Sequence, residues 1–524
     1  MRNPLFARKP MHMLHAEAGE TGEGTLHRHL GSWSLVSLGV GAIIGAGIFV
    51  LTGAAAAQYA GPAIVLSFIL AGVGCVFAGL CYAEFAAMIP LAGSAYTYGY
   101  ATLGEIFAWV IGWDLVLEYA FGAATVASGW SGYLVSFLQD FGIYLPPRFT
   151  ATPGTDLVFY NARWDRLATV LPTLKAHGVD PALLPHATGV FNLVAFIAIM
   201  LVTVVLVIGI KESANANNFV VALKVSIVLV FIGVASTFAF RHPAVMMANW
   251  HPFIPPNTGA FGHYGWSGIA RGAGVTFFAY IGFDAVSTTA QETRDPKKSM
   301  PIGILGSLLI CTFLYIAVSG LLTGVVNYKA LNVPDPVAIG VDATGIGYAM
   351  HVAGHAVKLS SFFVKLGAIA GLGSVMLVMM LGQSRVLYAM SKDGLLPAWA
   401  SKIHPRWRTP YISSIVVGIF VATFASLIPV GTLGELVSIG TLLAFVIVCA
   451  GVWELRVREP DIPRHFRTPW VPFVPIMGIL VSGLMMISLP LATWIRLVVW
   501  LAIGMMIYFG YSRHHSRVSN PEAQ

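Results

Sequence analysis

Long uninterrupted apolar runs recur through almost the whole sequence and constrain its fold more than any other feature. A helix needs about 20 apolar residues to cross the hydrocarbon core of a membrane, and about twelve such runs stand between short polar breaks. Of the 524 residues, 57% are hydrophobic and only 10% are charged, whereas a soluble chain is roughly a quarter charged. A membrane β-barrel would instead show segments of about ten residues with alternating polarity. The sequence therefore predicts an all-α integral membrane protein.

The expected spans are separated by short loops, with two longer polar segments between them. The spans are residues 35–59, 63–89, 106–138, 190–210, 219–240, 266–289, 302–326, 359–390, 412–429, 433–452, 471–489 and 491–510. The segment 141–189 predicts a partly ordered outer loop, and 327–358 predicts a second outer segment that covers a vestibule. Residues 1–30 and 511–524 predict polar tails.

The distribution of Lys and Arg predicts the orientation of the chain. Placing both termini on one side gathers most of the basic loop residues there, and positive residues favour the cytoplasm. Both termini are therefore expected to be cytoplasmic, in a multi-pass protein of the cell (inner) membrane. The formal charge of +7 is scattered through short loops and forms no stripe along one face, so no nucleic-acid partner is expected.

Neither a disulfide framework nor a metal centre is predicted. The four cysteines, Cys75, Cys81, Cys311 and Cys449, stand inside apolar runs, where a free thiol behaves as a small hydrophobe. His351 and His355 have the i, i+4 spacing of a helical metal pair. They lack a third ligand nearby, so the sequence predicts no metal and no cofactor.

Two of the spans are interrupted by glycine. The first reads GVGAIIGAGIF at residues 39–49, and the sixth reads GAGVTFFAYIGFD at residues 272–284. Small residues also serve close helix packing, which is the alternative for either run alone. If five helices are repeated with inverted topology, the two runs occupy corresponding positions, which is the pattern of a transporter site at the membrane midplane. Unwound backbone there exposes N–H groups for a carboxylate and carbonyls for an ammonium group, which predicts an amino acid substrate.

At this level of detail the sequence resembles the amino acid-polyamine-organocation (APC) superfamily, and within it bacterial members of the cationic amino acid transporter subfamily. The resemblance covers nearly the whole chain. It rests on five motifs: GAIIGAGIFVLTG (41–53), GWDLVLEY (112–119), GIKESANANNFVVALK (209–224), FFAYIGFDAVSTTAQETRDPKKSMPIGI (277–304) and GQSRVLYAMSKDGLLP (382–397). It implies alternating access through twelve helices, with inverted repeats over 31–240 and 266–452 and two extra helices over 471–510.

The resemblance also implies a substrate site around the two interruptions. Its residues would be Ile43, Ile44, Gly45, Ala46, Gly47, Glu118, Phe278, Ala279, Ile281, Gly282 and Met379. Phe278 matches an aromatic lid in the family, although a packed core aromatic explains it equally well. Mammalian relatives that accept arginine carry smaller polar residues near Met379, and methionine fills such space. The methionine therefore favours small neutral amino acids over cationic ones.

Lys224 and Asp284 are the expected proton-coupling residues. Bacterial relatives place a lysine at position 224, where sodium-coupled relatives bind a cation, and burial favours the neutral form of a lysine. The alternative is that its long stem reaches the membrane surface. Asp284 could relay protons, cap the resumed half-helix, or do both. Asp114 is expected to make structural hydrogen bonds, and Glu84 to act as a gate or a structural residue.

Two rival functions can be weighed. An intramembrane serine protease would fit the Gly-Trp-Ser-Gly stretches at 129–132 and 265–268, but no histidine base stands in any span, so no enzyme is expected. An amino acid exchanger or facilitator without obligatory proton movement remains open. The expected partners are the substrate, protons and the lipid bilayer, and the sequence does not reveal whether a small single-span subunit accompanies them.

Overall fold

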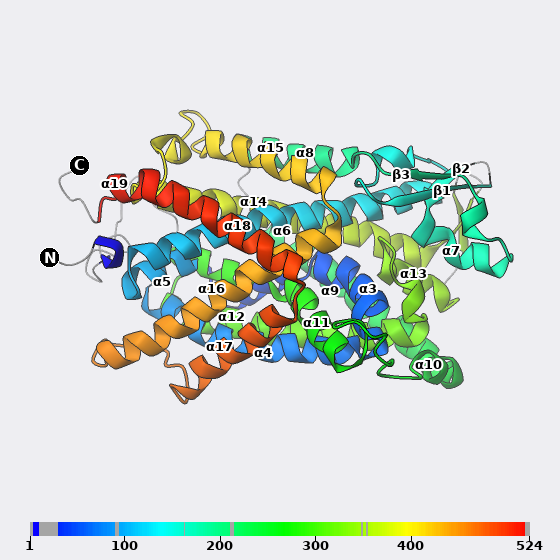
Figure 1. Ribbon diagram of the computed structural model, residues 1–524, viewed down its shortest axis with the longest axis horizontal. Coiled ribbons are helices and arrows are strands. Elements are labelled where there is room, and N and C mark those ends of the chain that lie inside the picture. The colour runs from blue at the N-terminus through cyan, green and yellow to red at the C-terminus, as the bar shows by residue number, and fades with distance from the viewer. Residues whose placement is uncertain are drawn as a thin grey trace.

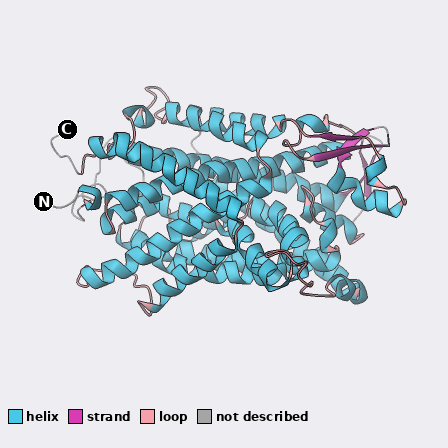
Figure 2. Cartoon of the chain, viewed as in Figure 1, coloured by secondary structure: helices cyan, strands magenta, loops and turns pink. Residues whose placement is uncertain are grey.

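Long helices lying roughly side by side make up most of the protein (Figure 1), with short strands at one end (Figure 2). The structure is a computed structural model that describes residues 4–9, 30–89, 94–161, 163–209, 214–346, 349–352 and 355–518. Most of the expected N-terminal tail therefore lies outside the described residues. The first and last described residues lie at the end that we term the terminal end, and the strands β1–β3 (Asp156–Tyr160, Arg163–Arg166 and His186–Thr188) lie at the opposite, loop end (Figure 1).

Within the described residues, eight helical segments are long and apolar enough to cross a membrane. They are Ser32–Met88, Glu105–Asp140, Asn218–Arg241, Gly265–Ala290, Pro296–Val325, Leu359–Lys392, Val430–Arg458 and Leu491–His515. Three shorter apolar helices accompany them, Leu193–Ile208, Tyr411–Leu427 and Phe473–Ser488. The protein is thus a mostly helical, multi-pass membrane protein, as the apolar runs predict.

The helices have the following bounds. The α-helices are α2 Ser32–Ile43, α3 Thr52–Ala55, α4 Ile64–Met88, α5 Ser94–Thr102, α6 Glu105–Asp140, α7 Leu167–Ala176, α8 Leu193–Ile208, α9 Ala214–Arg241, α10 Pro243–Asn249, α11 Gly265–Thr276, α12 Pro296–Val325, α13 Pro336–Ala343, α14 Leu359–Lys392, α15 Tyr411–Leu427, α16 Val430–Arg458, α17 Phe473–Ser488, α18 Leu491–Ile507 and α19 Arg513–His515. Shorter segments include the π-helices η2 Gly47–Leu51 and η3 Ala56–Ala60 and the 3₁₀ helices η7 Phe277–Tyr280 and η8 Asp284–Glu292.

Helix α6 runs through the middle of the bundle and packs against α14 and α16 along most of its length (Figure 1). Glycines allow this close approach: a Cβ atom on Gly112 would lie 2.8 Å from Met390 Sδ, and one on Gly122 would lie 2.6 Å from Met379 Sδ. In lipid the hydrophobic effect does not drive helices together, so these helices associate through close van der Waals packing at small residues. This packing positions the face of α6 that carries Glu118.

The two segments that the sequence predicts to be outer loops are more ordered than it indicates. Residues 141–189 contain the antiparallel sheet β2-β1-β3, with Val158 paired to Asp165 on one side and to His186 on the other, and helix α7. Residues 327–358 contain α13 and the hairpin β4 (Ala349–Val352) and β5 (His355–Lys358). The helical spacing expected for His351 and His355 is therefore wrong, because Val352 pairs with His355 across a hairpin that reverses the chain.

A charged cluster joins three elements at the terminal end. The carboxylate of Glu84, at the end of α4, accepts hydrogen bonds from Arg456 at 2.8 and 2.9 Å and from the amide of Thr468 at 2.7 Å. Arg464 Nε lies 3.1 Å from the same carboxylate, and the two side chains are only 1% and 2% exposed. Glu84 therefore ties α4 to the end of α16 and to the loop before α17, which supports a structural role.

Glu84→Ala is expected to destabilise the purified protein by about 3–5 kcal/mol, because it leaves a buried guanidinium without its carboxylate. The measurement is the apparent melting temperature in detergent. Arg458, which pairs with Glu454 and is 58% exposed, is the control: Arg458→Ala should change stability by less than about 0.5 kcal/mol. Equal shifts in the two variants would show that the Glu84 cluster does not hold the terminal end together.

Candidate functional site

The first predicted interruption is present between α2 and η2. Helix α2 ends at Ile43, the backbone of Ile44 is extended (φ −71°, ψ 95°), and a π-helical turn starts at Gly47. The amides of Gly45 and Ala46 donate no hydrogen bond within the described part of the chain. Such free N–H groups at the start of a helical segment form an anion-binding site.

The second interruption follows η7. Ile281 is extended (φ −60°, ψ 136°), and Gly282 adopts φ +118°, which strongly favours glycine. A Cβ atom on Gly282 would also lie 2.9 Å from the carbonyl carbon of Ala42 in α2, so a side chain has no room there. The segment resumes as the 3₁₀ helix η8 at Asp284. Both interruptions that the glycine runs predict are thus confirmed.

The two interruptions lie against each other. A Cβ atom on Gly47 would lie 2.2 Å from Ala279 Cα. The hydroxyl of Tyr315, in α12, lies 2.8 Å from the carbonyl of Ile43 and 2.9 Å from that of Ala279. One hydroxyl proton can serve only one of two carbonyls at a time. The site therefore keeps carbonyl acceptors beside the free amides of the first interruption.

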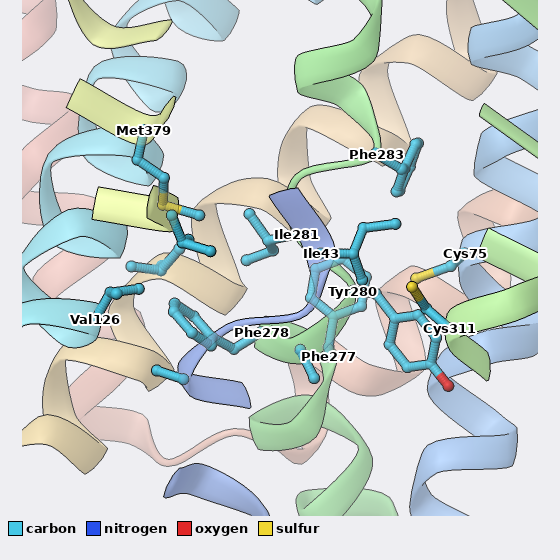
Figure 3. Packing of buried hydrophobic residues seen from close by; sticks show 14 of the residues in the cluster. Ile43, Cys75, Val126, Phe277, Phe278, Tyr280, Ile281, Phe283, Cys311 and Met379 are labelled. Carbon is cyan, nitrogen blue, oxygen red and sulfur yellow. The ribbon is translucent and has the colours of Figure 1, made fainter. Parts of the chain in front are cut away.

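Apolar side chains gather beside the interruptions. Phe278, Ile281, Met379 and Val126 lie around one region next to the unwound backbone (Figure 3). Phe278 is 3% exposed and Met379 is 4% exposed. Met379 extends from α14 to Gly122 of α6. These side chains present hydrocarbon and a thioether to the region (Figure 3).

Lys224 is fully buried between helices. Its Nζ donates a hydrogen bond of 2.7 Å to the carbonyl of Gly41, in the last turn of α2 before the interruption. A Cβ atom on Gly371 of α14 would lie 2.9 Å from Lys224 Cγ. The side chain therefore does not reach the membrane surface, which excludes the alternative left open by its long stem. Lys224 instead holds the end of the first half-helix.

Asp284 is the first residue of η8 and joins it to α6. Its Oδ1 accepts a 3.2 Å hydrogen bond from the amide of Gly282, and its Oδ2 accepts a 2.9 Å hydrogen bond from the hydroxyl of Tyr119. Glu118 is 1% exposed, and its Oε1 has no hydrogen-bond partner in the described structure. These two hydrogen bonds reach Gly282 and Tyr119, outside η8, so the capping role of Asp284 stays a prediction. Two buried carboxyl groups face the second interruption from α6 and η8.

A cavity of about 630 Å³ opens at the loop end and stops short of these residues. Its lining includes Val50, Gly129 and Val275, the N-terminal turn of α7 and the start of α16, but none of the predicted substrate residues. A Cβ atom on Gly129 would lie 2.8 Å from Val50 Cγ2 and 3.7 Å from Ala46 Cβ. The first interruption therefore lies directly behind the wall of the cavity.

The terminal end is closed beneath the same site. Leu30, just before α2, pairs with the chain after η8: its amide donates to Glu292 and its carbonyl accepts from Arg294, both at 3.0 Å. Arg385 of α14 lies 3.1 Å from the Glu292 carboxylate. The halves of both interrupted segments at the terminal end are thereby held together and to α14.

Three hydroxyl groups at the site were not predicted from the sequence. Tyr315 bridges the interruptions, Tyr119 binds Asp284, and the buried hydroxyl of Thr276 has no partner in the described structure. Tyr119 directly follows Glu118, and Thr276 stands inside the second glycine run. A search for hydroxyl-bearing residues next to Glu118 and within the second glycine run would have found Tyr119 and Thr276. Tyr315 has no such signal, because it lies in an unbroken span.

Comparison with known proteins finds strong similarity over the whole chain. The sequence profile described as amino acid permease matches residues 30–511. A branched-chain amino acid permease of Bacillus subtilis is 42% identical over 99% of this chain and 100% of its own length. The methylthioribose transporter of the same organism is 41% identical over 98% of both chains. A vacuolar cationic amino acid transporter of Arabidopsis thaliana is 30% identical over 99% and 97%.

Gly47→Ala is expected to lower the apparent melting temperature, because the added Cβ atom would press on the backbone of Ala279. Overpacking of this kind costs about 1–3 kcal/mol. Gly373→Ala in α14 is the matched control, since its nearest neighbour would be Trp130 Nε1 at an ordinary 3.8 Å. A melting temperature unchanged by Gly47→Ala would contradict the close packing of the two interruptions.

Proposed function

The chain belongs to the amino acid permease family of the APC superfamily, and on that premise we propose that it is a secondary active transporter that carries a neutral aliphatic L-amino acid together with a proton. The relatives are permeases and transporters, so the protein is not an enzyme. The observation that carries the proposal is the pair of interrupted helices packed against each other, which offers free amides and carbonyls in an otherwise apolar interior.

The proposed substrate site uses the interruptions for the charged groups of the amino acid. Its carboxylate would bind the amides of Gly45, Ala46 and Gly47, because free N–H groups at a helix start suit an anion. Its ammonium group would bind the carbonyls of Ile43 and Ala279, in place of the Tyr315 hydroxyl. The remaining proposed contacts are Ile44, Glu118, Phe278, Ile281, Gly282 and Met379.

The region around Met379 favours an aliphatic side chain. Phe278, Ile281 and Val126 surround the same space (Figure 3), and a cationic side chain there would lose its hydration among apolar groups. A branched-chain permease is among the most similar relatives. Methylthioribose, named for a relative of nearly equal identity, is the second candidate. It has no ammonium or carboxylate group to occupy the amides and carbonyls of the interruptions, so the amino acid is preferred.

Alternating access follows from the asymmetry between the two ends. A cavity from the loop end extends to the wall directly in front of the first interruption, whereas Leu30, Glu292 and Arg385 close the terminal end. Release towards the terminal end requires that the backbone pairing of Leu30 and the Arg385–Glu292 ion pair both separate. Substrate binding and this separation would alternate during a transport cycle.

The proposed topology has twelve crossings in the cell membrane. Ser32–Met88 would cross twice, the other long helical segments once each, and the three shorter apolar helices once each. Residues 31–240 and 266–452 would form the inverted repeats, with 471–510 as the extra pair. The terminal end would face the cytoplasm, because most Lys and Arg residues outside the spans lie on that side.

Lys224 and Asp284 are the proposed proton-coupling residues. Lys224 donates a hydrogen bond to the carbonyl of Gly41. Loss of its proton would weaken this bond to the half-helix that lies next to the substrate carboxylate. Asp284 stands at the start of the other half-helix. A change of protonation at either residue would therefore act on one of the two moving segments. An exchanger that needs no proton is the alternative.

A thermal-shift screen of the purified protein tests the substrate class. Leucine, isoleucine and valine are expected to raise the apparent melting temperature, because a ligand at about 100 times its Kd stabilises by about 2.7 kcal/mol. Arginine and methylthioribose should cause no shift. A shift with arginine or with methylthioribose alone would identify a different substrate class, and an empty screen would contradict the binding site itself.

Uptake of labelled leucine into proteoliposomes tests proton coupling. An imposed inward proton gradient should drive accumulation by the unmodified protein but not by Lys224→Ala or the better-filling Lys224→Met, because neither side chain carries a proton. The exposed Lys402 supplies the control Lys402→Ala. Gradient-driven uptake retained by both Lys224 variants would remove the role given to this residue, and uptake indifferent to the gradient in the unmodified protein would favour exchange.

A further inference from the structure

Asp114 is a buried carboxyl group that the proposed mechanism leaves unused. It lies on α6 one helical turn before Glu118 and is 0% exposed. Neither of its carboxylate oxygens has a hydrogen-bond partner in the part of the chain that the structure describes. The structural hydrogen bonds expected for Asp114 are therefore not found, and a buried carboxyl without partners requires another explanation.

Asp114 and Glu118 share one face of α6, because residues four apart are neighbours on a helix. That face meets α16 at two small positions. A Cβ atom on Gly440 would lie 4.0 Å from Asp114 Oδ1, and the Thr441 side chain lies within hydrogen-bonding reach of Glu118. Oε1 of Glu118 is unpartnered as well. The two carboxyl groups thus stand in one buried strip between α6 and α16.

No cationic group in the described structure neutralises this strip. Arg385 of α14 stands nearly level with it along α6, but it pairs with Glu292. The charged residues of α16, Glu435, Glu454, Arg456 and Arg458, lie towards its ends. Asp284, which also lies beside the strip, is itself acidic and accepts a hydrogen bond from Tyr119. Within the described residues no three His, Cys, Asp or Glu side chains are placed to hold a metal ion.

The chemical form that fits such a strip is a neutral carboxylic acid. An ionised carboxylate without donors or a cation is far more costly to bury than its protonated form. Two neighbouring carboxylates also cannot both ionise readily, so one proton shared between them is favoured. A pair of acids that holds a proton inside a membrane protein is a functional site by default.

We propose that Asp114 is a proton carrier that lies beyond Glu118 on the route to the terminal end, an inference that rests on the proposed proton-coupled function. Helix α6 runs from the terminal end towards the loop end, so Asp114 stands about 6 Å closer to the terminal end than Glu118. In the step, the O–H bond of protonated Glu118 breaks and an O–H bond forms on the Asp114 carboxylate. The negative charge moves back to Glu118, next to Tyr119 and Asp284.

The direction of transfer matches the asymmetry of the site. Asp284 and Glu118 lie beside the substrate region, and Asp114 lies on the closed side. A proton that enters with the substrate from the loop end would reach Asp114 and would leave when the terminal end opens. Asp114 is therefore a positioning and relay residue for the proton and makes no contact with the proposed substrate.

Asp114→Asn tests the proposal, because it preserves shape and permanently mimics the neutral acid. In proteoliposomes we expect this variant to retain leucine counterflow, which needs no net proton movement. It should lose accumulation under an imposed gradient of one pH unit, which can drive up to about tenfold accumulation per proton. Asp114→Glu, which restores a titratable acid, should recover the gradient response. Asp295→Asn, at an exposed carboxylate before α12, is the control.

The outcomes separate this proposal from the function on which it rests. Gradient-driven accumulation by Asp114→Asn equal to that of the unmodified protein would overturn the relay. Loss of both counterflow and leucine-induced thermal stabilisation in Asp114→Asn and Asp114→Glu alike would assign Asp114 a structural role and would also overturn it. Failure of the unmodified protein to catalyse leucine counterflow would instead contradict the proposed function.

Discussion

The structure depends on one constraint: within hydrocarbon, every backbone polar group must find a partner inside the protein. Continuous helices satisfy this condition by themselves, and two segments do not. At the first, Lys224 donates a hydrogen bond to the carbonyl of Gly41, and Tyr315 donates one to the carbonyl of Ile43. At the second, Asp284 accepts from Gly282. Side chains from α9, α12 and η8 therefore stabilise an unwound backbone that lipid would not tolerate, and the surrounding helices must be placed to deliver them.

Close packing follows from the same requirement. The two interruptions can share the Tyr315 hydroxyl only because their backbones lie close together, and the approach of Gly47 to Ala279 leaves no space for a Cβ atom. In the first half-helix, Gly39 and Gly41 similarly leave room for Ser307 and Val221. Gly371 of α14 leaves room for Lys224. Small residues are thus concentrated where the chain departs from regular structure, and large apolar residues such as Met379 and Phe278 fill the adjoining space (Figure 3).

The two ends of the molecule differ in how they are held. At the terminal end, the first and second interrupted segments are joined by backbone pairing at Leu30 and by the Arg385–Glu292 ion pair. At the loop end, the α7 and β1–β3 segment borders an open cavity. Ion pairs and short backbone pairings are weak compared with buried helix packing, because water competes for them. The contacts whose separation the proposed alternating-access cycle requires are therefore weak ones.

The sequence by itself determined the membrane class, the run of apolar helices and the position of both interruptions, because hydrocarbon imposes a length and a polarity on each span and only glycine-rich stretches can leave the helix. Composition could not reveal that residues 141–189 and 327–358 fold, since an apolar run as short as residues 157–160 of β1 does not distinguish a strand from a loop. Nor could it reveal that Lys224 turns inwards, that Asp114 lacks partners, or that Tyr315 in an unbroken helix joins the two interruptions. These facts are decided by which helix faces which, and distant contacts of this kind depend on the packing of the whole bundle.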